Sequence, residues 1–208
     1  MIEFVYFDLG GVLIRDFSDG TGKWAGMKKV MGVKPEFDKG FDELYNKYEL
    51  EELCLTRDVD SLIPIFSQKF RMKFPENFSM FKYFINHFNK NTSLWPVINF
   101  VHEKCGIGLL TNMYVDMLDA IKKKKLLPPI KFNVVIDSVD VGLQKPDPKI
   151  YKMAEEMCSF KGNEILFVEN SQKNIDAAKN FRWQTFLYDP SSPSLSSKKL
   201  LEFFKKNV

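Results

Sequence analysis

The feature that most constrains the fold is a short apolar run near the start of the chain that ends in an acid and two glycines. Residues 2–7 are almost all β-branched, aromatic or aliphatic, and Asp8, Gly10 and Gly11 follow. A continuous apolar run closed by glycines is typical of a buried strand in a parallel sheet. The run therefore predicts a central strand with Asp8 at its carboxyl end, which is the edge where open α/β sheets carry catalytic groups.

Residues 20–88 follow a different pattern. Apolar side chains recur there at helical spacing in four stretches, and no stretch reads convincingly as a strand. The residues that define the four stretches are Trp24, Met27, Val30 and Met31; Phe41, Leu44, Tyr45 and Tyr48; Leu62, Ile63, Ile65 and Phe66; and Phe78, Phe81, Phe84, Ile85 and Phe88. We expect four amphipathic helices whose many aromatic side chains form a helical core rather than a ligand-binding box.

From residue 92 onward, expected helices and strands alternate. We expect helices over residues 92–104, 113–125, 147–158, 174–181 and 196–206, and strands over residues 106–110, 132–136, 165–168 and 185–188. This alternation predicts an α/β fold with a doubly wound, Rossmann-like parallel sheet. The expected domains are an α/β core of residues 1–15 and 92–208 and an all-helical cap of residues 16–91, joined at residues 15–20 and 89–93.

Composition narrows the classes of function. The 208 residues are 45% hydrophobic and 27% charged, which is enough apolar material for a buried core, and the net charge is only +3. So small a basic excess gives no reason to expect nucleic acid or an anionic membrane as a partner. No apolar run approaches the roughly 20 residues of a membrane span. The oligomeric state cannot be inferred from these patterns.

The cysteines and the first residues bear on localisation. Cys54, Cys105 and Cys158 are odd in number and form no Cys-x-x-Cys pair, so neither a disulfide framework nor a structural zinc site is expected. The first four residues lack the basic stretch that opens a secretory signal. We therefore expect reduced thiols and a cytoplasmic protein.

Two of the expected strands end in groups that suit an anion site. Asp8 is followed by glycines that expose backbone N–H groups, so a carboxylate can lie beside an anion cradle. At the second strand end, the Thr111 hydroxyl and the Asn112 backbone amide can hydrogen-bond a phosphoryl oxygen. The structural alternatives are a turn with an aspartate cap at Asp8 and a helix N-cap at Thr111 or Asn112.

Two further places carry charged groups at or near strand ends. Lys145 stands directly before Pro146 and an expected helix start, so its backbone is stiffened and its side chain can be aimed. Glu169 and Asn170 follow another strand, and Glu169 would face the same crevice as Asp8. Oxygen ligands from two strand ends suit Mg²⁺. The alternatives are a solvated surface lysine and a helix cap at Asn170 or Ser171.

Together these four places resemble the motifs of the haloacid dehalogenase-like hydrolase superfamily, in the subgroup with a helical cap inserted after the first motif. Residues 7–13, Phe-Asp-Leu-Gly-Gly-Val-Leu, look like the first motif, and residues 110–112, Leu-Thr-Asn, look like the second. Residues 141–148, Val-Gly-Leu-Gln-Lys-Pro-Asp-Pro, closely resemble the third, and residues 167–170, Phe-Val-Glu-Asn, the fourth. The resemblance covers essentially the whole chain, although the cap is matched only by its position and helicity.

The resemblance implies a phosphomonoesterase that acts on a small phosphorylated metabolite. Asp8 would attack phosphorus and form an aspartyl phosphate that water hydrolyses. Mg²⁺ would be held by Asp8, the carbonyl of Gly10 and a side chain of the fourth motif, either Glu169 or Asn170. The phosphoryl oxygens would contact Thr111 and the backbone of Asn112, and Lys145 would offset the negative charge of Asp8 and the phosphate.

The sequence departs from the family pattern at two positions. Most family phosphatases carry a second acid two residues after the nucleophile, which protonates the leaving group, whereas this chain has Gly10. Loss of a general acid typically costs about 10²–10⁴-fold in rate. A branch of the family with a similar Asp-Leu-Gly sequence nonetheless resembles sugar-phosphate phosphatases. The fourth motif usually offers two acids, and an amide at Asn170 predicts weak Mg²⁺ binding.

Two other functions stay open at this point. The first is a catalytically weakened domain that binds a phosphorylated ligand or a protein partner, which Gly10 and Asn170 favour. The second is a metal-free 2-haloacid dehalogenase in which Asp8 attacks carbon and expels halide. Members of that branch carry an aromatic residue where Gly10 stands and a serine-rich fourth motif, so this chain resembles them less.

Overall fold

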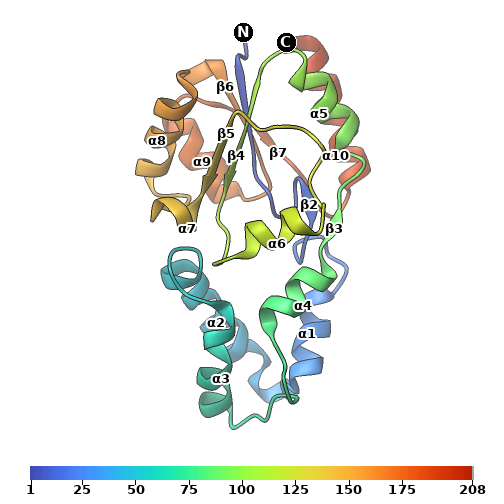
Figure 1. Cartoon of the computed structure of the whole chain (residues 1–208), viewed down its shortest axis with the longest axis vertical. Coiled ribbons are helices and arrows are strands. Elements are labelled where there is room, and N and C mark those ends of the chain that lie inside the picture. Colours follow the sequence, from blue (N-terminus) through green and yellow to red (C-terminus); the bar gives the residue numbers. More distant parts are fainter. Residues whose placement is uncertain (208) are drawn as a thin grey trace.

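The computed structural model describes residues 1–207 and is built on a five-stranded parallel sheet (Figure 1). The strands are β1 (Phe4–Phe7), β4 (Gly106–Thr111), β5 (Val134–Asp137), β6 (Ile165–Glu169) and β7 (Gln184–Leu187), in the order β5-β4-β1-β6-β7. The chain adds β4 and β5 on one side of β1 and then β6 and β7 on the other. The order therefore reverses beside β1, and ligand crevices of open α/β sheets lie at such switch points.

Helices cover both faces of the sheet, because side chains of successive strand residues point to opposite faces. On β1, Val5 and Phe7 join the core under α5 (Trp95–His102) and α10 (Pro193–Asn207). Phe4 and Tyr6 join the other core, under α8 (Pro148–Cys158) and α9 (Gln172–Asn180). Both faces of β1 are thus buried, which explains its continuous apolar sequence. The prediction of a doubly wound α/β fold is confirmed.

Four α-helices within residues 23–87 form a separate layer beyond the carboxyl ends of the strands (Figure 1). They are α1 (Lys23–Met31), α2 (Asp38–Tyr48), α3 (Leu62–Phe70) and α4 (Met80–His87), and we call them the cap helices. Two short strands, β2 (Ile14–Arg15) and β3 (Asn89–Lys90), pair antiparallel where the chain leaves and re-enters the sheet. The division into residues 16–91 and the rest stays a prediction, and this pairing supports it.

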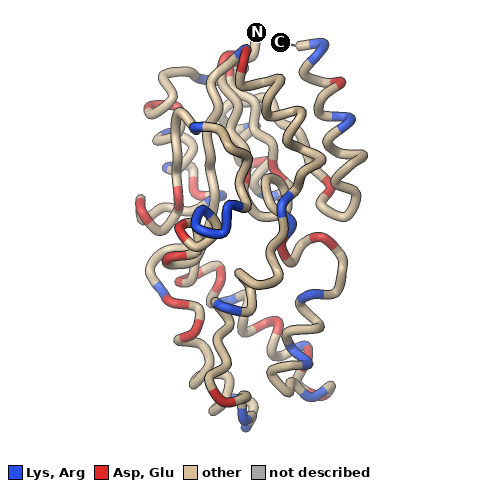
Figure 2. Tube along the Cα trace, turned by 45° about the vertical axis from the view of Figure 1, so that its right-hand side comes forward, with Lys and Arg blue, Asp and Glu red and all other residues tan. Residues whose placement is uncertain are grey.

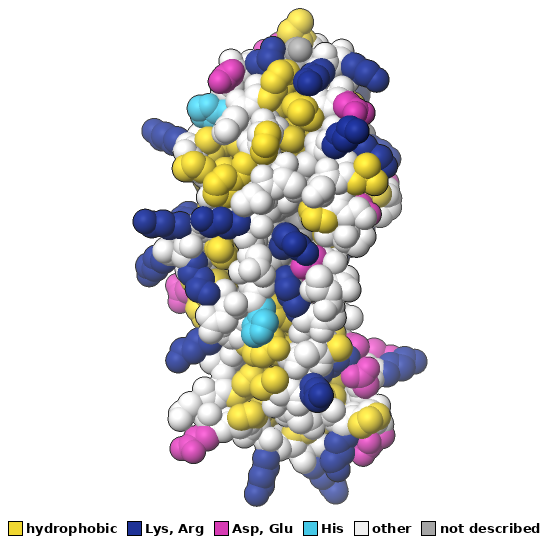
Figure 3. Space-filling view, turned by 90° about the vertical axis from the view of Figure 1, so that its right-hand side faces the viewer, with side chains coloured by type: hydrophobic (Ala, Val, Ile, Leu, Met, Phe, Trp, Pro, Cys, Tyr) yellow, Lys and Arg dark blue, Asp and Glu magenta, His cyan; other side chains and the backbone are white. Residues whose placement is uncertain are grey.

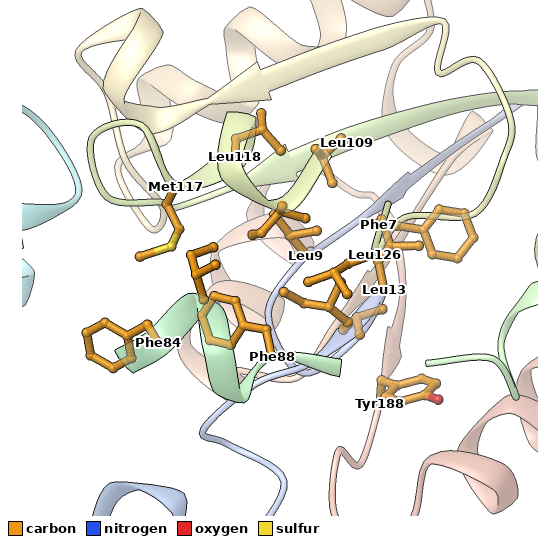
Figure 4. Close-up of a cluster of buried hydrophobic side chains, with 14 of the residues drawn as sticks. Phe7, Leu9, Leu13, Phe84, Phe88, Leu109, Met117, Leu118, Leu126 and Tyr188 are labelled. Atoms are coloured by element: carbon orange, nitrogen blue, oxygen red, sulfur yellow. The ribbon is translucent and has the colours of Figure 1, made fainter. Parts of the chain in front are cut away.

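The cap helices pack against the sheet layer through buried apolar side chains. Phe84 of α4 and Phe88, which directly follows α4, belong to the same buried cluster as Leu9 of the loop after β1 and Met117 of α6 (Met117–Lys123) (Figure 4). Buried residues of the cap helices and of one sheet face thus belong to one hydrophobic cluster. Burial at about 25 cal/mol per Å² makes such a shared cluster a substantial tie between the two layers.

Several element ends differ from the sequence prediction. The helix expected from residue 92 begins at Trp95, and its N-cap position is Leu94, which offers no side-chain acceptor. The helix expected over residues 113–125 is limited to α6, Met117–Lys123, after an N-cap position at Asp116 with a positive φ of 63°. The sequence analysis did not predict β2, β3 or the short helix α7 (Ser138–Val141).

Charge is spread over the molecule. Lys and Arg as well as Asp and Glu occur in both the sheet layer and the cap helices, and one run of lysines is continuous, at residues 122–125 (Figure 2). One face shows hydrophobic side chains in several groups, with basic side chains projecting between and around them (Figure 3). Within residues 1–207, no helix combines the length and the apolar character needed to cross a membrane.

Candidate functional site

A cavity of about 630 Å³ lies between the carboxyl edge of the sheet and the cap helices. Six of the seven residues singled out in the sequence bear on it: Asp8, Gly10, Asn112, Lys145, Glu169 and Asn170 all line it. The seventh, Thr111, is fully buried and does not line it. The topology brings these side chains together because parallel strands end at the same edge.

Asp8, Lys145 and Glu169 form a buried ion cluster at the floor of the cavity. The Lys145 Nζ donates to Asp8 Oδ1 at 2.8 Å and to Glu169 Oε2 at 2.7 Å. Asp8 lies directly after β1, Glu169 ends β6, and both flank the switch point. Only 2% of Lys145 is exposed, so the alternative of a solvated surface lysine is wrong.

The cluster shifts the proton affinities of its members. Burial and then the nearby Glu169 carboxylate raise the pKa of Asp8, while Lys145 opposes the shift. Burial alone would lower the pKa of Lys145, but Asp8 and Glu169 raise it on balance. Lys145 therefore stays protonated and supplies the one positive charge that holds two carboxylates together in a poorly solvated place.

Glu169 is saturated with hydrogen bonds from the protein. Its Oε1 accepts from the backbone N–H groups of Asn170 and Ser171 at 2.8 and 2.9 Å. Its Oε2 accepts from Lys145 and, at 3.0 Å, from Asn174 Nδ2. Glu169 thus holds Lys145 and the loop after β6 in place. Asn170, the other candidate metal ligand of the fourth motif, lies at the rim of the cavity, where its Nδ2 donates to Ser18 Oγ at 3.3 Å.

Asn112 positions Lys145 through the backbone. Its Nδ2 donates to the Lys145 carbonyl and its Oδ1 accepts from the Lys145 N–H, both at 2.8 Å. Asn112 therefore caps no helix, and that alternative is wrong. The hydroxyl of Thr111 is buried and has no hydrogen-bond partner among residues 1–207. Buried polar groups are normally paired, so this hydroxyl is a marked exception.

A carboxylate outside the four sequence motifs, that of Asp16, also lines the cavity. Asp16 follows β2, and its Oδ2 lies 2.5 Å from the point where a Cβ at Gly10 would stand. Its Oδ1 accepts hydrogen bonds from the backbone N–H and the hydroxyl of Ser18. Burial raises the pKa of Asp16, against the hydrogen bonds from Ser18 and the charge of Lys23. The sequence offered no signal for this placement, because the turn that brings Asp16 back to Gly10 has no distinctive spacing.

Polar groups on and around the cap helices face the sheet across the cavity. Asp42 of α2 accepts from Trp24 Nε1 at 2.7 Å and from Lys28 at 2.9 Å. The Tyr114 hydroxyl donates to Glu49 and lies 2.6 Å from the Tyr45 hydroxyl. The other polar side chains that line the cavity on this side or at its rim are Asn46, Gln144 and Lys173. The wall is therefore rich in hydrogen-bonding groups set among aromatic rings.

No Lys or Arg side chain of residues 20–88 lines this cavity. None of Lys34, Lys39, Lys47 and Arg57 lines it. Arg57 instead bonds Glu52 and Ser61 within the cap. The two lysines that do line the cavity are Lys145, in the cluster, and Lys173, which follows the loop after β6. The cap wall of the cavity therefore carries acids, amides and hydroxyls rather than cations.

The chain resembles known hydrolases in sequence. The family model of haloacid dehalogenase-like hydrolases matches residues 2–182. Bifunctional epoxide hydrolase 2 of Rattus norvegicus is 27% identical over 131 residues, which is 58% of this chain and 23% of that protein. The Mus musculus protein of the same name is 24% identical over 207 residues, which is 91% of this chain and 37% of that protein. The chain thus spans well under half the length of these relatives.

Solved structures share the fold. A predicted haloacid dehalogenase-like hydrolase from Porphyromonas gingivalis matches with a TM-score of 0.71 and 22% identity, over 91% of this chain and 92% of that one. An enzyme of the same family from Bacteroides thetaiotaomicron, in complex with magnesium and inorganic phosphate, matches with a TM-score of 0.67 and 18% identity, over 90% and 94% of the chains. L-2-haloacid dehalogenase from Xanthobacter autotrophicus gives 0.63 and 20%, over 90% and 78%.

Proposed function

Because this chain belongs to the haloacid dehalogenase-like hydrolase family, we propose that it is a Mg²⁺-dependent phosphomonoesterase that acts on a small phosphorylated metabolite. The observation that carries the proposal is the position of Asp8. Its carboxylate lies at the carboxyl end of the central strand, faces the cavity and is held by Lys145 at 2.8 Å. A fixed carboxylate beside a fixed cation is the arrangement that nucleophilic attack on a phosphate ester requires.

In the proposed reaction Asp8 attacks phosphorus with one carboxylate oxygen. The bond from phosphorus to the leaving oxygen breaks, and water then hydrolyses the aspartyl phosphate and releases inorganic phosphate. Lys145 stays protonated throughout and offsets the charge of Asp8 and of the phosphoryl group. Asn112 keeps Lys145 in place. The contact of Thr111 with a phosphoryl oxygen stays a prediction, because its unpaired hydroxyl is buried and does not line the cavity.

The side chains at the site fit Mg²⁺, with few charged ligands. Among the described residues no group of three or more His, Cys, Asp and Glu side chains can hold a metal ion. The available donors are oxygens: the Asp8 carboxylate, the Gly10 carbonyl and the Asn170 amide, since both Glu169 oxygens are occupied by protein donors. Mg²⁺ commonly takes one or two carboxylates and completes its shell with waters and phosphate. When bound, the ion would neutralise charge on the transferred group.

The cavity wall favours a polyhydroxylated substrate such as a sugar phosphate. Asp42, Glu49, Asn46 and Gln144 present hydrogen-bonding groups that suit hydroxyls, and Trp24 presents an aromatic surface. Among residues 1–207, the cap side adds no cation to the cavity wall for a second phosphate, which favours a monophosphate over a diphosphate. The Bacteroides thetaiotaomicron structure with magnesium and phosphate supports the same class of reaction.

Hydrolysis of 4-nitrophenyl phosphate tests the proposal. The wild-type protein should release nitrophenolate with Mg²⁺ and lose this activity with a chelator, and Asp8→Asn should be inactive under both conditions. Asp176→Asn, a surface carboxylate on α9, is the matched control and should keep full activity. Silence on this ester and on a panel of sugar and nucleotide phosphates would overturn the proposal. It would favour the ligand-binding alternative, with halide release from 2-haloacids as the remaining assay.

A further inference from the structure

We propose that Asp16 is the proton donor to the leaving oxygen and the group that later activates water, in place of an acid at position 10. This inference rests on the phosphomonoesterase activity proposed above. Its basis is a spatial exchange between two residues six positions apart in the chain. Gly10 has no side chain, and the Asp16 carboxylate occupies the space that a side chain there would fill.

The exchange is visible in the distances. A Cβ built on Gly10 would stand 2.5 Å from Asp16 Oδ2 and 3.4 Å from its Cγ. The chain turns back between the two residues, with Gly11 at a φ of 76° and its N–H bonded to the Ile14 carbonyl at 2.9 Å. Residue 10 can therefore carry a side chain only if Asp16 moves. The Asp16 carboxylate therefore lies where the side chain of an acid at position 10 would lie, although Asp16 is six residues further along the chain.

Asp16 is also held with one oxygen free for chemistry. Ser18 donates to Oδ1 through both its backbone N–H and its hydroxyl, and Lys23 fixes the Asp16 carbonyl at 2.8 Å. Among the described residues no donor is bonded to Oδ2, the oxygen that faces Gly10. A proton carrier needs this combination of a fixed carboxyl and an uncommitted oxygen within reach of the reacting atoms.

The other carboxylates of the cavity already accept hydrogen bonds from the protein. Glu169 accepts four hydrogen bonds, and Asp42 is paired with Lys28 and Trp24. Glu49 accepts from Tyr114. Neither histidine of the chain lines the cavity. Asp16 is thus the carboxyl best placed to exchange a proton beside Asp8.

Over the two steps Asp16 gives up one proton and takes one back. In the first step, the Asp8 carboxylate attacks phosphorus, the phosphorus–oxygen bond to the alcohol breaks, and the Asp16 carboxyl gives its proton to that oxygen. In the second step, the oxygen of a water molecule attacks phosphorus in the aspartyl phosphate while Asp16 takes a proton from that water. The bond from phosphorus to the Asp8 oxygen breaks, and the Asp8 carboxylate is released. The enzyme is regenerated, with one alcohol and one phosphate as products.

Two esters of similar size separate this role from a general loss of function. Benzyl phosphate leaves as an alkoxide and needs a proton, whereas 4-nitrophenyl phosphate leaves as a stable phenolate. With Asp16→Asn, kcat/KM for benzyl phosphate should fall by about 10²–10³-fold, and kcat/KM for 4-nitrophenyl phosphate by less than about tenfold. Because water activation is also lost, the variant should release nitrophenolate in a burst that matches the enzyme concentration.

Two further variants test the proposal even if Asp16→Asn does not fold. Gly10→Ala keeps Asp16 but places a methyl group 2.5 Å from its Oδ2, so it should show the same selective loss on benzyl phosphate. Asp16→Gly combined with Gly10→Asp moves the acid to position 10 and should recover at least tenfold of the benzyl phosphate activity that Asp16→Gly alone loses. Asp176→Asn should hydrolyse both esters as the wild type does.

Each contrary result has one meaning. Equal losses on the two esters with Asp16→Asn would overturn the proton-donor role, as would losses that high Mg²⁺ restores on both, since Asp16 would then be a metal ligand. No loss on benzyl phosphate would also overturn it. A wild-type protein that hydrolyses neither these two esters nor any member of the panel of sugar and nucleotide phosphates would overturn the phosphomonoesterase proposal itself, and this inference with it.

Discussion

At the scale of single residues, one buried lysine and two buried carboxylates form the floor of the cavity. Lys145 balances Asp8 and Glu169 where water has little access. Removal of one partner of a buried ion pair lowers the stability of the fold by far more than the intact pair adds to it, because the remaining charge stays buried without a partner. The same residues that perform the proposed chemistry therefore also determine the stability of the sheet edge.

Lys145→Met should destabilise the protein strongly. It leaves two buried carboxylates side by side without a cation, and removal of one partner of a buried ion pair costs about 3–5 kcal/mol. The free energy of unfolding, measured by urea denaturation, should fall by this amount. Lys123→Met, at an exposed lysine of α6, should change it by less than about 0.5 kcal/mol. Equal effects of the two substitutions would contradict the buried cluster.

Asn170→Asp should strengthen Mg²⁺ binding. The substitution replaces a neutral amide with a carboxylate at the rim of the cavity, and a charged ligand is preferred by this hard cation. The Mg²⁺ concentration that gives half-maximal activity should fall about tenfold, which corresponds to about 1.4 kcal/mol. Asn163→Asp, at an exposed position outside the cavity, is the control. An unchanged Mg²⁺ requirement would show that Asn170 is not a ligand.

At the scale of elements, sequence patterns predicted strands and helices better than the loops that join them. Both faces of β1 are buried, so its apolar run is unmistakable, and Asp147 caps α8 as expected, accepting from the Lys149 N–H at 2.9 Å. The pairing of β2 with β3 was not predicted, since two-residue strands leave no periodicity. The place of Asp16 in the cavity could not be predicted for the same reason, because it depends on this turn.

Asn91 should matter more than its neighbour Asn89 for this junction. Asn91 is 2% exposed, and its Nδ2 donates to the Val12 carbonyl at 2.7 Å and to the Tyr188 hydroxyl at 2.8 Å, which joins β3 to the first loop. Asn91→Ala leaves buried acceptors unpaired and should lower the free energy of unfolding by about 1–3 kcal/mol. Asn89→Ala, at an exposed residue, should have little effect. Thermal denaturation of both variants compares them.

Asp137, which ends β5 and caps α7, should make stability depend on pH. Burial raises its pKa to about 6, although the Val139 N–H opposes the shift. The folded protein thus holds this proton more tightly than the unfolded chain, whose carboxyl titrates near about 4. The stabilisation is complete below about pH 4 and is lost as pH rises through about 6.

Asp137→Asn removes this titration and keeps an acceptor for the Val139 N–H. The variant should be more stable than the wild type by about 1–3 kcal/mol at about pH 7.5, and the difference should vanish near about pH 4. Denaturant unfolding at the two pH values measures it. A wild type that equals the variant at the higher pH would show that the Asp137 carboxylate is not penalised by burial.

At the scale of the whole molecule, a parallel sheet supplies the reacting groups and the cap helices close the cavity over them. The strand order brings Asp8 next to Lys145 and Glu169, which lie more than 130 residues further along the chain, and all three line one cavity. The orientation of the cap helices could not be predicted, because helical periodicity gives a buried face but not its partner. The cap residues that face the substrate, such as Asp42 and Glu49, therefore emerged only from the structure.

The most direct test of the account is to identify the atom that receives the phosphoryl group. Wild-type protein turning over 4-nitrophenyl phosphate with Mg²⁺ is quenched in acid within milliseconds, digested and examined by mass spectrometry. The account predicts one phosphoryl group on the peptide that contains Asp8, and none in Asp8→Asn. Turnover without a phosphorylated Asp8, or a phosphoryl group on another residue, would contradict it.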